Sequence, residues 1–144
     1  MDAKVKFVEG MQFVGYASSG HAIVMDGDHE VGGNDTGSRP SELLLIAIGG
    51  CTGMDVISIL RKKKQDVTSF EINVHGDKAG NHPKKFETMT LEYVFKGHNL
   101  SEEAVKRACE LSFEKYCTVR ASLAPGVNIT YTYKIIEDVE NTAL

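Results

Sequence analysis

The chain has 144 residues, 42% of them hydrophobic and 25% charged, and a formal net charge of −4. This length suits one domain of ordinary size, so we expect a single domain over residues 1–144. The acidic balance argues against a nucleic-acid interface, which is usually basic, and against a polybasic membrane anchor. The first ten residues lack an apolar signal segment, and the longest strongly apolar run, residues 43–48, is too short to span a bilayer. We therefore expect a cytoplasmic protein with no membrane contact.

Residues 1–40 predict a small sheet followed by a loop. Apolar residues alternate at residues 5–7 and 11–13, and a further short apolar run covers residues 22–25. Glycine and Ser-Gly pairs separate these runs, a pattern typical of hairpins in a meander. Residues 26–40 are rich in Gly and Asp and therefore predict a loop.

A long helix is predicted from Glu42 to Leu60. Pro40 suits its first turn, where the missing N–H has no consequence. The first half is apolar on nearly every side, which is typical of a helix enclosed by protein.

Three later segments alternate with period two: residues 70–74, 89–95 and 127–135. Each is expected to be a half-buried antiparallel strand. Between the last two, Ser101 predicts the N-cap of a second helix that ends before Cys117. The order of elements predicts an α+β domain in which helices pack on antiparallel sheets, with a long buried central helix.

The three cysteines form a sparse, odd set, which indicates a reducing compartment rather than a disulfide framework. The chain contains no CxxC motif and no Cys/His pair at metal-ligand spacing, so we expect no metal site.

Cys51 follows Gly49 and Gly50 inside the long helix, where each glycine costs about 1 kcal/mol relative to Ala. The pair indicates close approach of another backbone or of a small ligand. The alternative is tight helix packing around a buried structural thiol. Cys117 follows the second helix, where a thiol can change partner, or it is also a buried structural group. Cys109 lies within the second helix and is predicted to be structural.

Arg39 and Glu42 flank the start of the long helix. The guanidinium could stabilise a thiolate or polarise a peroxide while the carboxylate holds it. The alternative is ordinary helix-start chemistry, in which an acidic group suits the first turn.

Two segments together resemble the signatures of the OsmC/Ohr family: GSRPSELLLIAIGGCTGMDVISIL at residues 37–60 and EKYCTVRASL at residues 114–123. A Pro–Glu–Leu helix start leads to one cysteine, and a second cysteine follows the second helix. The element order agrees over essentially the whole chain. Within the family, the chain is most similar to an uncharacterised branch with an LGGC-type helix.

The resemblance implies an intertwined homodimer with active sites at the subunit interface. It implies a peroxidase for small organic hydroperoxides, with Cys51 as the attacking thiol and Cys117 as its disulfide partner. An external thiol would restore the pair, protein-bound lipoyl groups being one candidate, and no metal, haem or flavin is required. The alternative function is a non-catalytic dimer that binds an apolar small molecule at the subunit interface.

The resemblance also implies two residues that this chain lacks. In the peroxidase branches of the family a catalytic arginine comes from the N-terminal strands, whereas no arginine precedes Arg39 here. Those branches also have a glutamate ten residues before the first cysteine, whereas that position is Ser41 here, with Glu42 one residue later. In a continuous helix the nine residues from Glu42 to Cys51 span roughly 13 Å, so we expect Glu42 to reach a thiol only across a dimer interface.

Overall fold

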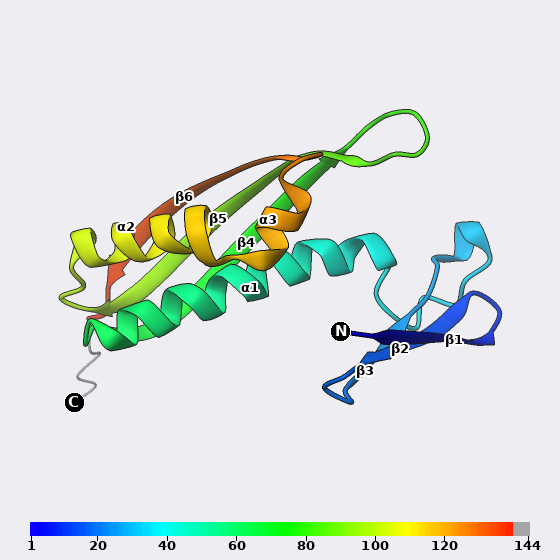
Figure 1. The fold of residues 1–144 in the computed structure, drawn as a ribbon, viewed down its shortest axis with the longest axis horizontal. Helices are drawn as coiled ribbons and strands as arrows, with labels where there is room; N and C mark the ends of the chain where they lie inside the picture. The colour runs from blue at the N-terminus through cyan, green and yellow to red at the C-terminus, as the bar shows by residue number, and fades with distance from the viewer. Residues whose placement is uncertain (140–144) are drawn as a thin grey trace. The chain divides into compact units, whose positions relative to one another are not determined.

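A computed structural model describes residues 1–139 of the chain. The chain divides between Leu44 and Leu45 into two compact units, and each contains its own three-stranded sheet (Figure 1). The α+β class predicted from the sequence is confirmed. That both units form one domain stays a prediction.

The first unit is an antiparallel meander of β1 (Ala3–Glu9), β2 (Gln12–Ala17) and β3 (Ala22–Met25), in the order β1-β2-β3. Each of the three strands overlaps the residues predicted for it from alternation or, for β3, from a short apolar run. A 3-10 turn, η1 (His29–Val31), interrupts the glycine-rich loop that follows.

Asp26 organises this loop from a nearly fully buried position. Its carboxylate accepts hydrogen bonds from the backbone N–H groups of Gly27, Asn34 and Thr36, and from the Thr36 hydroxyl at 2.6 Å. The Thr36 hydroxyl is the main cause of a lowered pKa for this carboxyl. A loop that composition marks as irregular is therefore fixed by one anion.

The long helix α1 (Pro40–Lys62) begins at the predicted proline and extends the predicted helix by two residues at its C-terminal end. Only one stripe of it is buried in the chain: Ile48, Thr52, Val56 and Leu60. Ile46 and Met54 are 61% and 74% exposed. The second unit therefore buries one side of α1, and enclosure of the other side by protein stays a prediction.

Judged by length and composition alone, α1 could cross a membrane, a test that core helices of soluble proteins also pass. The estimate from the sequence considered only the unbroken run at residues 43–48, whereas the helix is much longer. Its buried stripe belongs to the core of the second unit, so we assign α1 to that core.

The second sheet contains β4 (Asp66–Lys78), β5 (Phe86–His98) and β6 (Asn128–Glu137), in the order β4-β5-β6. β4 and β5 are antiparallel as predicted, whereas β6 pairs parallel with β5, so the expectation of a third antiparallel strand is wrong. The helical segment between β5 and β6 carries the chain back to the start of β5, which is the geometry of a parallel crossover.

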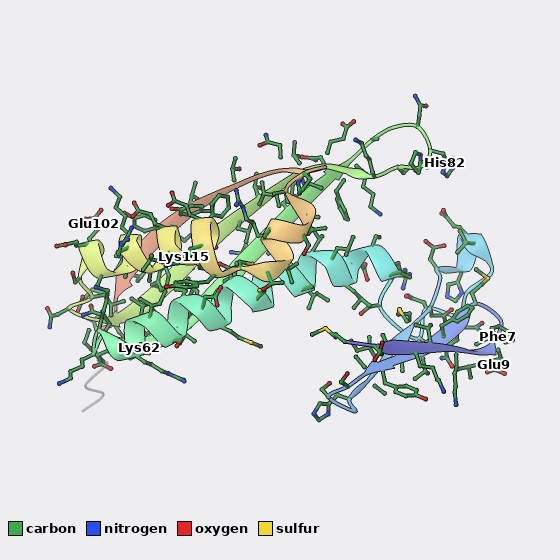
Figure 2. The ribbon with its side chains drawn as sticks, viewed as in Figure 1. Phe7, Glu9, Lys62, His82, Glu102 and Lys115 are labelled. Atoms are coloured by element: carbon green, nitrogen blue, oxygen red, sulfur yellow. The ribbon has the colours of Figure 1, made fainter. Side chains whose placement is uncertain are left out.

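That crossover comprises α2 (Glu102–Leu111), a π-helical turn η2 (Ser112–Tyr116) and a short helix α3 (Thr118–Leu123), which the sequence did not predict. Ser101 caps α2 as expected, with its hydroxyl accepting the Ala104 N–H. Figure 1 shows α2 running back beside α1, and in Figure 2 Lys62 marks the end of α1 and Glu102 the start of α2. The two helices pack on β5, whose inward side chains form the centre of the core: Met89, Leu91, Tyr93 and Phe95.

Candidate functional site

Two thiols and one carboxylate converge between α1 and the crossover. The Sγ atoms of Cys51 and Cys117 and a carboxylate oxygen of Asp55 all lie within 4.8 Å of one another. Cys51 and Asp55 are half-buried and Cys117 is 3% exposed. The two cysteines predicted as a pair are therefore brought together, with an acidic residue that the prediction did not include.

α1 supplies two of these three groups. Cys51 and Asp55 are four residues apart, so their side chains lie on the same face of the helix. A Cβ at Gly49 would lie 3.2 Å from the Val74 side chain, whereas a Cβ at Gly50 would meet nothing within 4 Å. Gly49 thus allows α1 to pack tightly on β4, whereas the helix surface at Gly50 has open space around it.

Cys117 occupies the junction between η2 and α3, where the backbone is extended. Its N–H donates to the Ser112 carbonyl at 2.9 Å, and its Sγ accepts the Arg120 N–H at 3.3 Å. The thiol therefore faces α1 because the π-helical turn ends there and a new helix begins.

Three buried hydroxyls connect the core to Asp55. Thr52 Oγ1 lies 2.6 Å from the Tyr93 hydroxyl and 2.8 Å from Ser112 Oγ, and Ser112 Oγ donates to Asp55 Oδ2 at 2.9 Å. An ionised carboxylate only accepts, so the donors must run from Tyr93 to Thr52, from Thr52 to Ser112, and from Ser112 to Asp55. This chain orients the carboxylate beside the thiols.

Burial raises the pKa of two thiols in the second unit, Cys117 and Cys109. Loss of hydration raises the pKa of Cys117 to about 11, although the Arg120 N–H opposes this. Cys51 and the charge of Asp55 raise it further. Burial likewise raises the pKa of Cys109, which is fully buried on α2, to about 12. Both groups are therefore neutral thiols near pH 7.

Arg39 and Glu42 belong to the first unit and have local partners. The Glu42 carboxylate accepts the Arg39 backbone N–H at 2.8 Å, which is the helix-start role offered as the alternative. The Arg39 guanidinium pairs with Asp35 and donates to the Gly37 carbonyl, and the Asp35 bond is the main cause of its raised pKa. A role for either residue at the thiols stays a prediction.

A groove of about 560 Å³ opens beside the carboxylate. Its lining combines Asp55 and Lys62 with apolar side chains of α1 and the crossover: Met54, Ile59, Leu111 and Tyr116. Small molecules thus have a partly apolar route to Asp55.

Asp55 and the hydroxyls behind it were missed by the sequence reasoning. The signal for Asp55 was available, because an acidic residue four positions after a helical cysteine lies on the same face. Ser112 carried no such signal, since its position depends on the π-helical turn.

The fold and this arrangement define the class of protein. The family profile described as OsmC-like protein matches residues 32–132, so the chain belongs to the OsmC-like family.

Among individual relatives, protein YhfA of Escherichia coli K12 is 41% identical over 136 residues, covering 94% of this chain and 98% of that protein. A hypothetical protein from Aquifex aeolicus VF5 has a solved structure with a TM-score of 0.83, 32% identity and coverage of 96% and 97% of the two chains. An organic hydroperoxide resistance protein OsmC from Legionella pneumophila has a TM-score of 0.66 at 13% identity, with coverage of 92% and 95%. At that identity the last likeness shows the fold alone.

Proposed function

We propose that this chain is a thiol-dependent peroxidase that reduces organic hydroperoxides through a Cys51/Cys117 dithiol–disulfide cycle. The observation that carries the proposal is the convergence of these two sulfurs, within 4.8 Å, from distant parts of the sequence. A disulfide is about 2.05 Å long, so side-chain rotation must close the remaining gap of under 3 Å. Two proteins of similar fold are named organic hydroperoxide resistance proteins, which supports the proposed substrate class.

The roles of the two thiols follow from exposure. Cys51 is half-buried and therefore accessible to a peroxide, whereas Cys117 is sealed and protonated because its pKa is raised to about 11. Only a thiolate attacks a peroxide at a useful rate. Cys51 is therefore the first nucleophile and Cys117 the resolving thiol.

In the first step, the Cys51 thiolate attacks one peroxide oxygen of ROOH and the O–O bond breaks. Cys51 becomes a sulfenic acid, and RO⁻ leaves and takes up a proton as the alcohol. The Cys117 sulfur then attacks the Cys51 sulfur, and a disulfide forms with release of water. An external dithiol, for which protein-bound lipoyl groups are one candidate, reduces the disulfide and is itself oxidised.

The apolar surroundings favour organic peroxides over hydrogen peroxide. Met54, Leu111 and Tyr116 line the groove beside Asp55, and Met54 and Tyr116 are 74% and 48% exposed. An alkyl or aryl group would bury this surface, gaining about 25 cal/mol for each Å² removed from water.

We also propose that the protein acts as a cytoplasmic homodimer. Exposed Leu44, Ile46 and Met54 leave an apolar side of α1 for a second copy to cover. In this arrangement Arg39 and Glu42 of a second copy would activate Cys51. Analytical ultracentrifugation tests the dimer, and a monomer at micromolar concentration would contradict it.

The test of the peroxidase is anaerobic mixing of the reduced, chelator-treated protein with cumene hydroperoxide, followed by counting of free thiols. Wild type should lose two thiols per chain and yield a Cys51–Cys117 crosslinked peptide. Cys117→Ser should instead accumulate a sulfenic acid that dimedone traps on Cys51, and Cys51→Ser should not react. Cys109→Ala is the matched control, because this thiol is fully buried and should leave the rate unchanged.

An unreactive wild-type protein would remove the peroxidase proposal. Loss of reaction in Cys109→Ala, with Cys51→Ser still active, would assign the chemistry to a different thiol. Hydrogen peroxide run in parallel should react more slowly than the organic peroxide, and the reverse order would contradict the proposed substrate class.

A second candidate, non-catalytic binding of an apolar small molecule, is favoured by a different observation. The first unit contains a cavity of about 620 Å³ with mainly apolar walls: Val5, Met11, Phe13, Met25, Val31 and Pro40. Such a protein would gain thermal stability from an apolar ligand even in the Cys51→Ser/Cys117→Ser variant. If the double variant shows that gain while wild type fails to reduce peroxide, the binding function replaces the catalytic one.

A further inference from the structure

The cluster of Cys51, Asp55 and Cys117 has the donor atoms of a metal site. Thiolate sulfur and carboxylate oxygen both bind Zn²⁺, at about 2.3 Å and 2.0–2.2 Å. Two sulfurs on a tetrahedral ion lie about 3.8 Å apart at these bond lengths. The three donor atoms already lie within 4.8 Å of one another, so movements of about 1 Å would suffice.

The backbone holds these donors on regular elements. Cys51 and Asp55 share one face of α1 at spacing i, i+4, which is the spacing that zinc-binding helices use to present two ligands. Cys117 lies at the η2–α3 junction, where two backbone hydrogen bonds fix its position. The sequence shows no metal-binding motif around Cys51 because the third ligand, Cys117, comes from a distant segment.

Outer contacts orient two of the three ligands. Ser112 Oγ donates to Asp55 Oδ2, which leaves Oδ1 as the ligand atom, and the Arg120 N–H donates to Cys117 Sγ. Such partners fix the direction of metal ligands in established sites. The ion pairs found within residues 1–139 join other carboxylates, and the hydrogen bond found at the Asp55 side chain comes from Ser112.

We propose that Cys51, Asp55 and Cys117 bind one soft divalent cation of the zinc class, with water in the fourth position. The groove that Asp55 lines gives the ion and the water access from solvent. Three protein ligands with an open fourth position resemble a catalytic rather than a structural coordination.

Metal binding and disulfide formation exclude each other, because both use the same two sulfurs. A bound ion therefore withholds Cys51 and Cys117 from peroxide, and the disulfide form has no thiolate to offer the ion. The metal site itself does not depend on the peroxidase, since it requires only reduced thiols.

The test uses reduced, chelator-stripped protein without oxygen, titrated with Co²⁺ and then with Zn²⁺. We expect one Co²⁺ per chain, with sulfur-to-cobalt charge-transfer absorption and tetrahedral d–d bands, and displacement by one Zn²⁺. Ser112→Ala should weaken Zn²⁺ binding roughly 10–100-fold, the usual effect of losing an outer partner. Asp55→Asn should weaken it more, and Cys109→Ala should leave it unchanged.

A second measurement uses only the wild-type protein, so it tests the proposal even if a variant fails to fold. One equivalent of Zn²⁺ should slow the alkylation of Cys51 and Cys117 by iodoacetamide. Cys109 is fully buried, so its alkylation is measured after a denaturant pulse and should not depend on Zn²⁺. Absence of the cobalt bands at one equivalent, or Zn²⁺ affinity unchanged in Asp55→Asn, would overturn the proposal. Because peroxide reduction is assayed after chelation, a failed metal titration leaves the peroxidase untouched, and a failed peroxidase assay leaves the metal site untouched.

Discussion

The buried hydroxyl chain makes a sharp prediction for stability. Thr52→Val keeps the shape of the side chain but removes the oxygen that joins Tyr93 to Ser112. Thr52, Tyr93 and Ser112 are at most 2% exposed, so water cannot replace the lost partner. The substitution therefore leaves the Tyr93 hydroxyl as a buried donor with no acceptor.

The size of the effect follows from that stranded group. A buried hydroxyl without a partner destabilises the folded state by about 1–3 kcal/mol. Ser112 keeps its bond to Asp55, so the loss should not extend further along the chain. Tyr93→Phe alone should cost less, about 0.5–1.5 kcal/mol, because Thr52 can still donate to Ser112.

Urea unfolding of the two single variants and the double variant measures the coupling. Thr52→Val/Tyr93→Phe should recover most of the loss caused by Thr52→Val, because removing both partners leaves no unsatisfied donor. Thr90→Val on the exposed face of β5 is the matched control and should change stability by less than about 0.5 kcal/mol. Simple additivity of the two single variants, or a neutral Thr52→Val, would refute the proposed direction of the hydroxyl chain.

Four further outcomes are expected. In Cys51→Ser, the rate of Cys117 alkylation by iodoacetamide should still increase with pH at pH 10, because burial raises the pKa of this thiol to about 11 and keeps the reactive thiolate scarce. A midpoint near 8.5 in a pH series of these rates would contradict this. Glu42→Gln should preserve stability within about 0.5 kcal/mol, since an amide oxygen can still accept the helix-start N–H, while Cys51 oxidation slows about tenfold or more if the carboxylate acts on a partner's thiol; stopped-flow rates and melting curves separate the two roles. Gly50→Ala should stabilise the monomeric fold by up to about 1 kcal/mol, because a methyl group there meets open space, and sedimentation should show weaker dimerisation if a second copy needs that space. Asp26 has a lowered pKa, so its stabilisation is present above the unfolded value of about 3.9 and is lost as pH falls through the folded value; hydrogen exchange in the 26–38 loop should show this acid loss in wild type and not in Asp26→Asn.

The elements of this fold were largely readable from hydrophobic period and caps. Period-two runs marked five of the strands and a short apolar run marked β3, while Pro40 marked the start of α1 and Ser101 the cap of α2. Strand direction was misread for β6 because alternation is the same in parallel and antiparallel strands. The informative signal was the helix between β5 and β6, since a crossover of that length permits a parallel return.

The surroundings of α1 could not be read in the same way. An apolar circumference predicts that something covers the helix, but it does not say whether the cover belongs to the same chain. In the described residues, the sheet covers the stripe of Ile48 and Leu60 while Ile46 and Met54 stay exposed. In the candidate site, the family resemblance predicted the pair of Cys51 and Cys117. The position of Ser112 beside Asp55 could not be predicted, because it depends on a π-helical turn that no sequence pattern indicated.

Asp55 ties the two proposals to one electrostatic requirement. Its carboxylate raises the pKa of Cys117, so negative charge in this cluster works against forming thiolates. A nearby cation reverses that effect, because it favours the charged form of every group around it. In the proposed peroxidase the cation would be a guanidinium, for which Arg39 of a second copy is the candidate, whereas in the proposed metal site it would be the bound ion. Dimer formation should therefore speed peroxide reduction, and zinc should stop it, although both bring positive charge to the same thiols.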